Sequence, residues 1–242
     1  MHLAFFILAI ASTLSGQGEP PLLSFQAMQD LRDGLSAKIV EVEVVQRPQP
    51  EADQSFGITI SGQAVCLRDS SGQLHVVTSQ MLVQDATRVR IRSKGSADWV
   101  VAEVESVNSA AAIALLARIG DAPFRCTETR LARVSDLNVG GPVPAPVFSV
   151  DNPVDLPNIF WGYVAKNAEP PSDEYLLTTT GLPVGYPLFT AEGELAALNL
   201  RRYTPTSDKF LAVSCDQLRR LFWYRDAMPP QDRVNRRDSD QP

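Results

Sequence analysis

The sequence predicts an all-β fold, built as a sandwich or a barrel. Short runs of β-branched and apolar residues recur along most of the chain, and turn residues such as DSSG at 69–72 separate them. No helical periodicity separates one strand from the next, as it would in the βαβ units of a parallel sheet. We therefore expect many short strands, with helices only near the two ends.

The first half of the chain begins with one helix and continues with strands. Apolar residues at 25, 28, 31 and 35 recur at three- and four-residue steps, which predicts a short amphipathic helix. Residues 39–44 (IVEVEV) alternate as a half-buried strand does, and the prolines and charges of 47–55 predict a loop. Further strands are expected at 64–67, 74–78, 88–92, 99–104 and 112–116.

The glycines and prolines of 120–140 predict a connection to a second set of strands. Gly193 supplies the positive φ that a tight hairpin needs, and Ser214 is the expected N-cap of a final helix over 215–224. Two proline-rich segments, PVPAP (142–146) and DNPVDLPN (151–158), are predicted to be loops. The strands of this half are expected at 147–150, 160–164, 175–179, 187–189, 195–199 and 210–213.

Composition excludes several classes of protein. The chain has 242 residues, 44% hydrophobic and 21% charged, so it is neither a disordered polymer nor a multi-span membrane protein. Its 22 basic and 28 acidic residues give a net charge of −6, which argues against nucleic-acid binding. Two histidines, His2 and His75, leave little for zinc ligation, and no cofactor motif is present. We expect no metal and no cofactor.

The N-terminal residues predict export. The apolar run at 3–14 is too short to cross ~30 Å of hydrocarbon, and small and polar residues follow it at 15–18. This pattern is typical of a signal peptide cleaved near 15–18, which would make the protein secreted or periplasmic. The alternative is an uncleaved membrane anchor formed by residues 3–14.

Export permits a disulfide, but the sequence does not choose one. Cys66, Cys126 and Cys215 allow three choices of a single pair, with one thiol left over. The alternative is that all three are small buried hydrophobic residues.

Three segments, in order along the chain, resemble trypsin-like serine proteases of the HtrA/Deg branch without a PDZ domain. GQAV (62–65) with DSSGQLHVVTSQM (69–81) is similar to that family's small-residue strand, D-x-x-G turn and V-T-x-x-H ending. AIALL (112–116) resembles D-I-A-L-L. GLPVGYPLF (181–189) with EGELAALN (192–199) resembles P-G-N-S-G-G-P-L-L and D-G-E-V-I-G-I-N. The resemblance covers residues 25–224.

The resemblance implies two six-stranded antiparallel β-barrels, perpendicular to each other, with the working cleft between them. The domain organisation that follows is a signal peptide (1–17), an N-terminal segment with a short helix (18–35), a first barrel (36–120), an inter-barrel connection (121–135), a second barrel with a C-terminal helix (136–226) and a disordered tail (227–242).

The resemblance also implies that the catalytic positions are vacant. The family's histidine, aspartate and serine correspond to Met81, Ala112 and Val184. A thioether is no base at neutral pH, a methyl group accepts no hydrogen bond, and an isopropyl group has no nucleophilic atom. Shifting the alignment by one residue restores none of the three roles.

The resemblance also implies an altered oxyanion hole. Backbone N–H groups at Leu182 and Val184 would form it, and Pro183 between them has no N–H to donate. Tyr186 adds bulk where the family has glycine. We expect a filled or remodelled cleft.

Three functions remain open. The leading hypothesis is an exported pseudoprotease that binds a protein or an extended peptide. The candidate strand for pairing with such a peptide is formed by Leu198, Asn199, Leu200 and Arg201. The alternative is that these residues form an ordinary core strand. The second is a hydrolase with a displaced nucleophile, taken from Ser79, Ser109, Thr178, Thr179 or a cysteine. The third is a structural envelope protein that uses the aromatic residues 222–224 and the tail for association. We expect no nucleic-acid partner, and membrane contact only through an uncleaved N-terminal segment.

Overall fold

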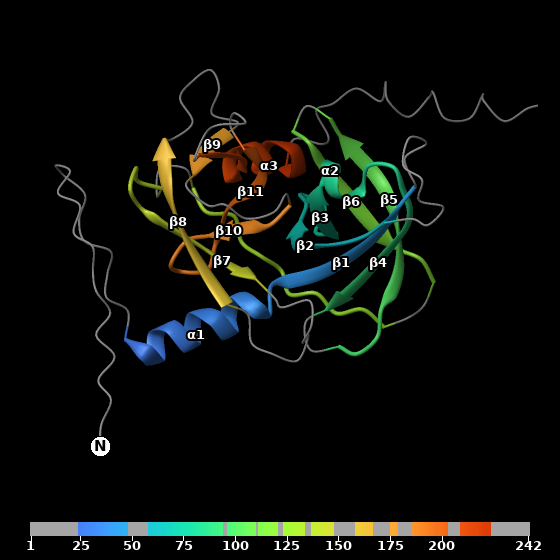
Figure 1. Cartoon of the computed structure of the whole chain (residues 1–242), viewed down its shortest axis with the longest axis horizontal. Helices are drawn as coiled ribbons and strands as arrows, with labels where there is room; N and C mark the ends of the chain where they lie inside the picture. The colour runs from blue at the N-terminus through green and yellow to red at the C-terminus, as the bar shows by residue number, and fades with distance from the viewer. Residues whose placement is uncertain are drawn as a thin grey trace, which may run out of the picture.

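The computed structural model describes residues 24–47, 58–93, 96–109, 111–120, 123–133, 137–147, 158–166, 175–178, 185–202 and 209–223. Within these residues the chain forms a closed β-barrel and a separate six-stranded sheet that lie against each other (Figure 1). The predicted signal peptide, Tyr224 and the predicted tail lie outside the described residues. No described helix is long and apolar enough to cross a membrane.

The closed barrel confirms the all-β prediction for the first half. Its strands pair antiparallel in the order β1-β2-β3-β6-β5-β4, and the barrel closes because β1 pairs with both β2 and β4. Val40, Val42 and Val44 of β1 point into its core, as the alternation in the sequence predicts. The strands are β1 (Ile39–Gln46), β2 (Ile58–Arg68), β3 (Leu74–Ser79), β4 (Ala86–Ser93), β5 (Val100–Asn108) and β6 (Ile113–Arg118).

The second half is an antiparallel sheet with the order β10-β11-β12-β9-β8-β7. No pairing of described residues joins its outer strands β10 and β7, so the described residues form an open sheet, and the second closed barrel that the resemblance implies is not shown. The strands are β7 (Pro142–Val147), β8 (Asn158–Lys166), β9 (Tyr175–Thr178), β10 (Pro187–Phe189), β11 (Leu195–Arg202) and β12 (Phe210–Ser214).

The loop prediction for 142–146 is wrong, because this proline-rich segment is the edge strand β7. Pro142, Pro144 and Pro146 alternate, so their missing N–H groups all fall on the same edge of the strand. The intervening residues pair with β8 through the other edge. On the proline edge, the Pro146 carbonyl accepts a hydrogen bond from Gln63 Nε2 at 2.9 Å. An edge without donors cannot continue a ladder, which explains why the sheet ends at β7. Of the strand expected at 147–150, Val147 belongs to β7, and residues 148–150 lie outside the described residues.

The helices are α1 (Phe25–Ser36), α2 (Gln80–Val83) and α3 (Cys215–Trp223). Helix α1 confirms the amphipathic prediction, and the Ser24 hydroxyl caps it by accepting from the Ala27 N–H at 3.1 Å. The Ser214 hydroxyl accepts from the Gln217 N–H at 3.2 Å, which confirms its predicted role as N-cap of α3. The sequence did not predict α2.

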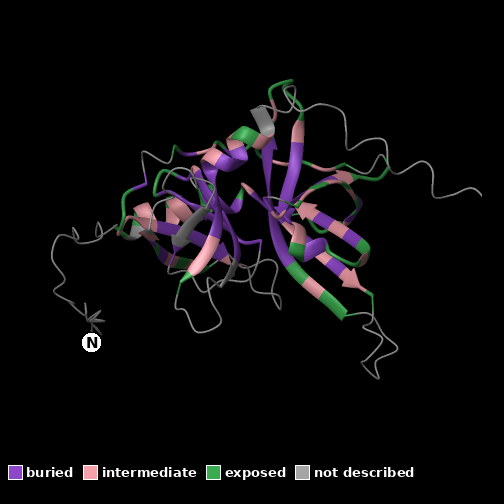
Figure 2. Cartoon of the chain, turned by 90° about the horizontal axis from the view of Figure 1, so that it is seen from above, coloured by how far each residue is buried: buried purple, intermediate pink, exposed green. Residues whose placement is uncertain are grey.

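One apolar cluster joins the two halves. Leu35 of α1, Val77 of the barrel, Phe189 and Leu198 of the sheet and Leu218 of α3 all belong to it and are buried. Figure 2 shows buried stretches on strands of both halves. The shared core fixes the barrel against the sheet.

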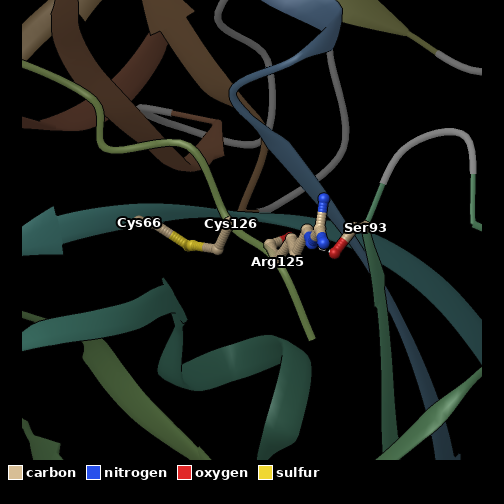
Figure 3. The surroundings of a disulfide bond; sticks show 4 residues. All are labelled: Cys66, Ser93, Arg125 and Cys126. Atoms are coloured by element: carbon tan, nitrogen blue, oxygen red, sulfur yellow. Dashed lines mark hydrogen bonds between the residues drawn. A yellow bond between two sulfur atoms is a disulfide. The ribbon is translucent and has the colours of Figure 1, made fainter. Parts of the chain in front are cut away.

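The structure makes the choice among the cysteines that the sequence left open. Cys66 and Cys126 form a disulfide, with their Cα atoms 6.2 Å apart (Figure 3). Cys215 is a buried free thiol.

Candidate functional site

Two of the three positions that the sequence resemblance aligns with a catalytic triad lie on adjoining segments. Met81 belongs to α2, directly after β3, and Ala112 directly precedes β6, which pairs with β3. The Gln80 N–H donates to the Ala112 carbonyl at 2.8 Å. The barrel therefore brings positions 81 and 112 to the same end of two neighbouring strands.

The third position, Val184, lies outside the described residues, as do Leu182 and Pro183. The next residue, Gly185, is described. Its N–H donates to the Asn199 carbonyl at 2.7 Å, and its φ is +86°. A Cβ added at Gly185 would lie 3.4 Å from the Cβ of Ser79 and from Thr78 Oγ1. The segment that follows Val184 thus reaches the end of β3 at Ser79, two residues before Met81 in the chain.

The described polar side chains at this meeting point form hydrogen bonds with the backbone. The Ser79 hydroxyl accepts from the Met81 N–H at 3.2 Å, and the Thr78 hydroxyl donates to the Gln63 carbonyl at 2.8 Å. Among the described residues, neither hydroxyl has a histidine or carboxylate partner that could take its proton. Met81 itself is 46% exposed, so this end of the barrel presents an apolar side chain to solvent.

Ala112 has an unusual backbone conformation. Its φ of +53° lies in the left-handed region, which non-glycine residues rarely occupy and in which Asn and Asp are enriched. The sequence resemblance predicts an aspartate at this position, and the left-handed backbone at Ala112 would suit aspartate better than alanine.

The remaining histidine belongs to a separate polar cluster. His75 is buried, and its Nε2 lies 2.9 Å from Asp69 Oδ2. The Ser71 hydroxyl donates to the other carboxylate oxygen of Asp69 at 2.6 Å. Because the carboxylate lies between the serine and the histidine, the imidazole is not placed to accept the serine proton.

The Asp69 carboxylate is also a poor base. The Ser71 hydroxyl, followed by His75 and the Gln73 N–H, holds the pKa of Asp69 well below its usual range. The cluster therefore stabilises the turn between β2 and β3.

The displaced nucleophiles considered from the sequence find no described base. Thr178 is wholly buried and Ser109 is exposed, while Thr179 lies outside the described residues. Burial raises the pKa of the Cys215 thiol to about 12, so the reactive thiolate is disfavoured. Ser79 serves as the cap of α2.

The candidate pairing strand lies inside the sheet. Leu198 pairs with Pro187 of β10 and Val213 of β12. Asn199 pairs with β12, and on its other side its N–H donates to the Tyr186 carbonyl at 2.9 Å. Leu198 and Asn199 therefore belong to a core strand and have no open edge.

Among the described residues, the second half of this segment, Leu200 and Arg201, extends beyond the pairing with β10. Leu200 is buried, and Arg201 pairs with Leu211 of β12. An added strand at Leu198 or Asn199 would have to displace β10. The sequence left this open, because edge or interior position depends on the order of strands.

Two side chains show how the boundary between barrel and sheet is filled. Tyr186 is buried in the core of the sheet, and burial, with the nearby Glu41 carboxylate, raises its pKa. Gln63, which is 2% exposed, bridges from β2 to the Pro146 carbonyl of β7. The sequence indicated the bulk of Tyr186, but it gave no signal for the role of Gln63.

A scan against models of protein families finds no match for this chain, and a search of curated proteins finds no similar sequence.

Proposed function

We propose that this protein is a catalytically inactive relative of the trypsin-like serine proteases, similar to their HtrA/Deg branch, which is exported and binds a protein or an extended peptide. The observation that carries the proposal is the meeting of three segments at the barrel–sheet boundary. Met81 and Ala112 lie on two of them, and the third follows directly after Val184. None of these positions supplies a base, a carboxylate or a nucleophile.

The chemistry of this surface favours binding. Met81 is 46% exposed and Ala112, on the adjoining segment, is half-buried, so apolar side chains occupy the positions where the family would present polar catalytic groups. A flexible thioether adapts to apolar side chains of different shapes. Because Leu198 and Asn199 have no open edge, we assign recognition to the surface around Met81 and not to strand addition at those residues.

Isothermal titration with a permanently unfolded polypeptide, such as reduced and carboxymethylated α-lactalbumin, tests the proposal. We expect saturable binding, weakened about tenfold by Met81→Glu, because the substitution places a charge in an apolar contact. Val139→Glu is the matched control, since Val139 is an exposed apolar residue in the turn before β7.

Two results would refute the proposed site. One is the absence of binding heat from the wild-type protein. The other is an equal loss of affinity in the Met81 and Val139 variants.

A further inference from the structure

Residues 123–133 connect the barrel to the sheet, and a disulfide attaches them to the barrel. We call this segment the strap. It contains no helix or extended strand of its own. On the barrel side, Cys126 of the strap is bonded to Cys66 of β2. Next to this bond, the Ser93 hydroxyl of β4 donates to the Arg125 carbonyl (Figure 3). The disulfide is thus the covalent part of a local attachment.

The other attachments to the barrel are non-covalent. The Thr129 N–H donates to the Cys66 carbonyl at 2.8 Å. Arg68 Nε lies 2.7 Å from Glu128 Oε2, but the two side chains are 45% and 42% exposed. An exposed ion pair contributes little to stability. The disulfide is therefore the strongest link between the strap and the barrel.

The far end of the strap is held by the sheet. The Leu195 N–H donates to the Arg130 carbonyl at 2.8 Å, and the Ala132 N–H donates to the Leu195 carbonyl at 3.0 Å. Arg219 of α3 donates to the Ala132 carbonyl at 2.6 Å. These contacts involve no cysteine, so they do not depend on the oxidation state of the disulfide.

Strap side chains cover part of the barrel core. Phe124 and Cys126, two residues apart, are half-buried and pack against the apolar cluster inside the barrel. Cys66 belongs to that cluster and is fully buried. If the barrel end of the strap moved away, apolar surface would be exposed to solvent.

We propose that the strap is a redox-operated latch, closed by the Cys66–Cys126 disulfide and released by a dithiol reductant. A thiolate of the reductant attacks the more accessible sulfur, Cys126 Sγ, and forms a mixed disulfide with it. The Cys66 sulfur leaves and takes a proton. The second thiol of the reductant then closes its own disulfide and releases the Cys126 thiol, so the reductant is oxidised as the protein is reduced.

Release is local because the two ends of the strap are held differently. Reduction leaves the barrel end with the Thr129–Cys66 backbone hydrogen bond, the bond from the Ser93 hydroxyl to the strap and an exposed ion pair. Leu195 and Arg219 keep the other end in place. In a reducing environment, opening of the latch would therefore expose apolar surface of the barrel core, while the sheet stays folded. This inference does not depend on the proposed binding function.

Hydrogen–deuterium exchange of the full chain, with and without dithiothreitol followed by alkylation, tests the latch. We expect amide exchange at 124–129 to become about tenfold faster on reduction, while β11 exchanges unchanged. Binding of the dye ANS should rise at the same time, because the barrel core is uncovered. The double variant Cys66→Ala/Cys126→Ala should match the reduced protein and ignore the reductant, whereas Cys215→Ala should respond like wild type.

Unchanged exchange at 124–129 in fully reduced and alkylated protein would overturn the latch, and this measurement does not require any variant to fold. Faster exchange throughout the chain would overturn it as well, since the disulfide would then stabilise the whole fold and not one segment.

Discussion

At the scale of single residues, Ala112 provides a test of backbone strain. A non-glycine residue at φ +53° is strained, and glycine adopts this conformation without a Cβ clash. We predict that Ala112→Gly raises the free energy of unfolding by about 1 kcal/mol, measured by urea denaturation. Ala114→Gly, in the buried middle of β6, is the control and should lower it. Equal destabilisation by both substitutions would contradict the strain at position 112.

Asp69 makes stability depend on pH in the acid range. Its pKa in the folded protein lies below the ordinary value of 3.8, chiefly because the Ser71 hydroxyl donates to the carboxylate. A lowered pKa means that its contribution is complete above 3.8 and is lost as pH falls toward the folded value. We predict that Asp69→Asn costs about 2 kcal/mol at neutral pH and progressively less in acid.

Urea denaturation of wild type and the Asp69 variant across this pH range measures the difference. Asp98→Asn, at an exposed position, is the control and should leave the pH profile unchanged. A cost at Asp69 that is constant with pH would show that the carboxylate charge has no part in holding the turn.

Cys215 should be chemically silent in the folded protein. Its thiol is buried and its pKa is raised to about 12, so little thiolate exists at pH 8. We predict no reaction with Ellman's reagent in the native state, and one thiol per chain after unfolding without reductant. Rapid labelling of the native protein, or three thiols after unfolding, would refute the assigned cysteine states.

At the scale of elements, strands β1 and β4 carry a ladder of charges on the outside of the barrel. Glu41 lies opposite Arg92 and Glu43 opposite Arg90, and each pair forms a salt bridge. The Trp99 ring covers both guanidinium groups, with its centroid 4.4 Å from Arg92 Cζ and 5.2 Å from Arg90 Cζ. The aromatic ring and the cross-strand pairs together hold the edge at which the barrel closes.

We predict that Trp99→Leu lowers the free energy of unfolding by about 1 kcal/mol, because it removes the cation–π contacts but keeps an apolar side chain. Trp99→Phe should retain part of this stabilisation. Thermal and urea denaturation measure both variants. If the Leu and Phe variants were equally stable, the aromatic contact would contribute nothing.

Element prediction from sequence succeeded where periodicity was regular and failed where local rules conflicted. The alternation of residues 39–44 predicts β1, and the spacing of apolar residues predicts α1. Strand β7 was missed because prolines normally interrupt strands, whereas here they alternate along one unpaired edge. Helix α2 was missed because four residues carry no measurable periodicity.

At the scale of the whole molecule, the sequence does not predict which cysteines or strands that lie far apart in the chain pair with each other. The partners Cys66 and Cys126 are 60 residues apart, and nothing in their local sequences distinguishes them from Cys215. The interior position of β11 depends on which strands flank it. The closure of the first half and the openness of the second also depend on strand order and on the donor-free edge of β7.

The candidate site, too, could be predicted only in part from the sequence. The resemblance proposes the three positions from the sequence alone, because a residue that lacks a base or a nucleophile is recognised without coordinates. Their proximity required the fold, which joins Gln80 to Ala112 and sets Gly185 against Ser79. The bridge from Gln63 to Pro146 could not be foreseen, since it links β2 to a strand that the sequence did not predict.

The proposed function requires that this chain carry no protease chemistry. Intact-mass spectrometry of the native chain after incubation with an excess of a fluorophosphonate probe tests it most directly. We predict an unmodified mass, because no described hydroxyl at positions 78, 79 or 178 has a base beside it, and position 184 holds valine. A single adduct per chain that is absent from heat-unfolded protein would contradict the claim and reveal an activated nucleophile.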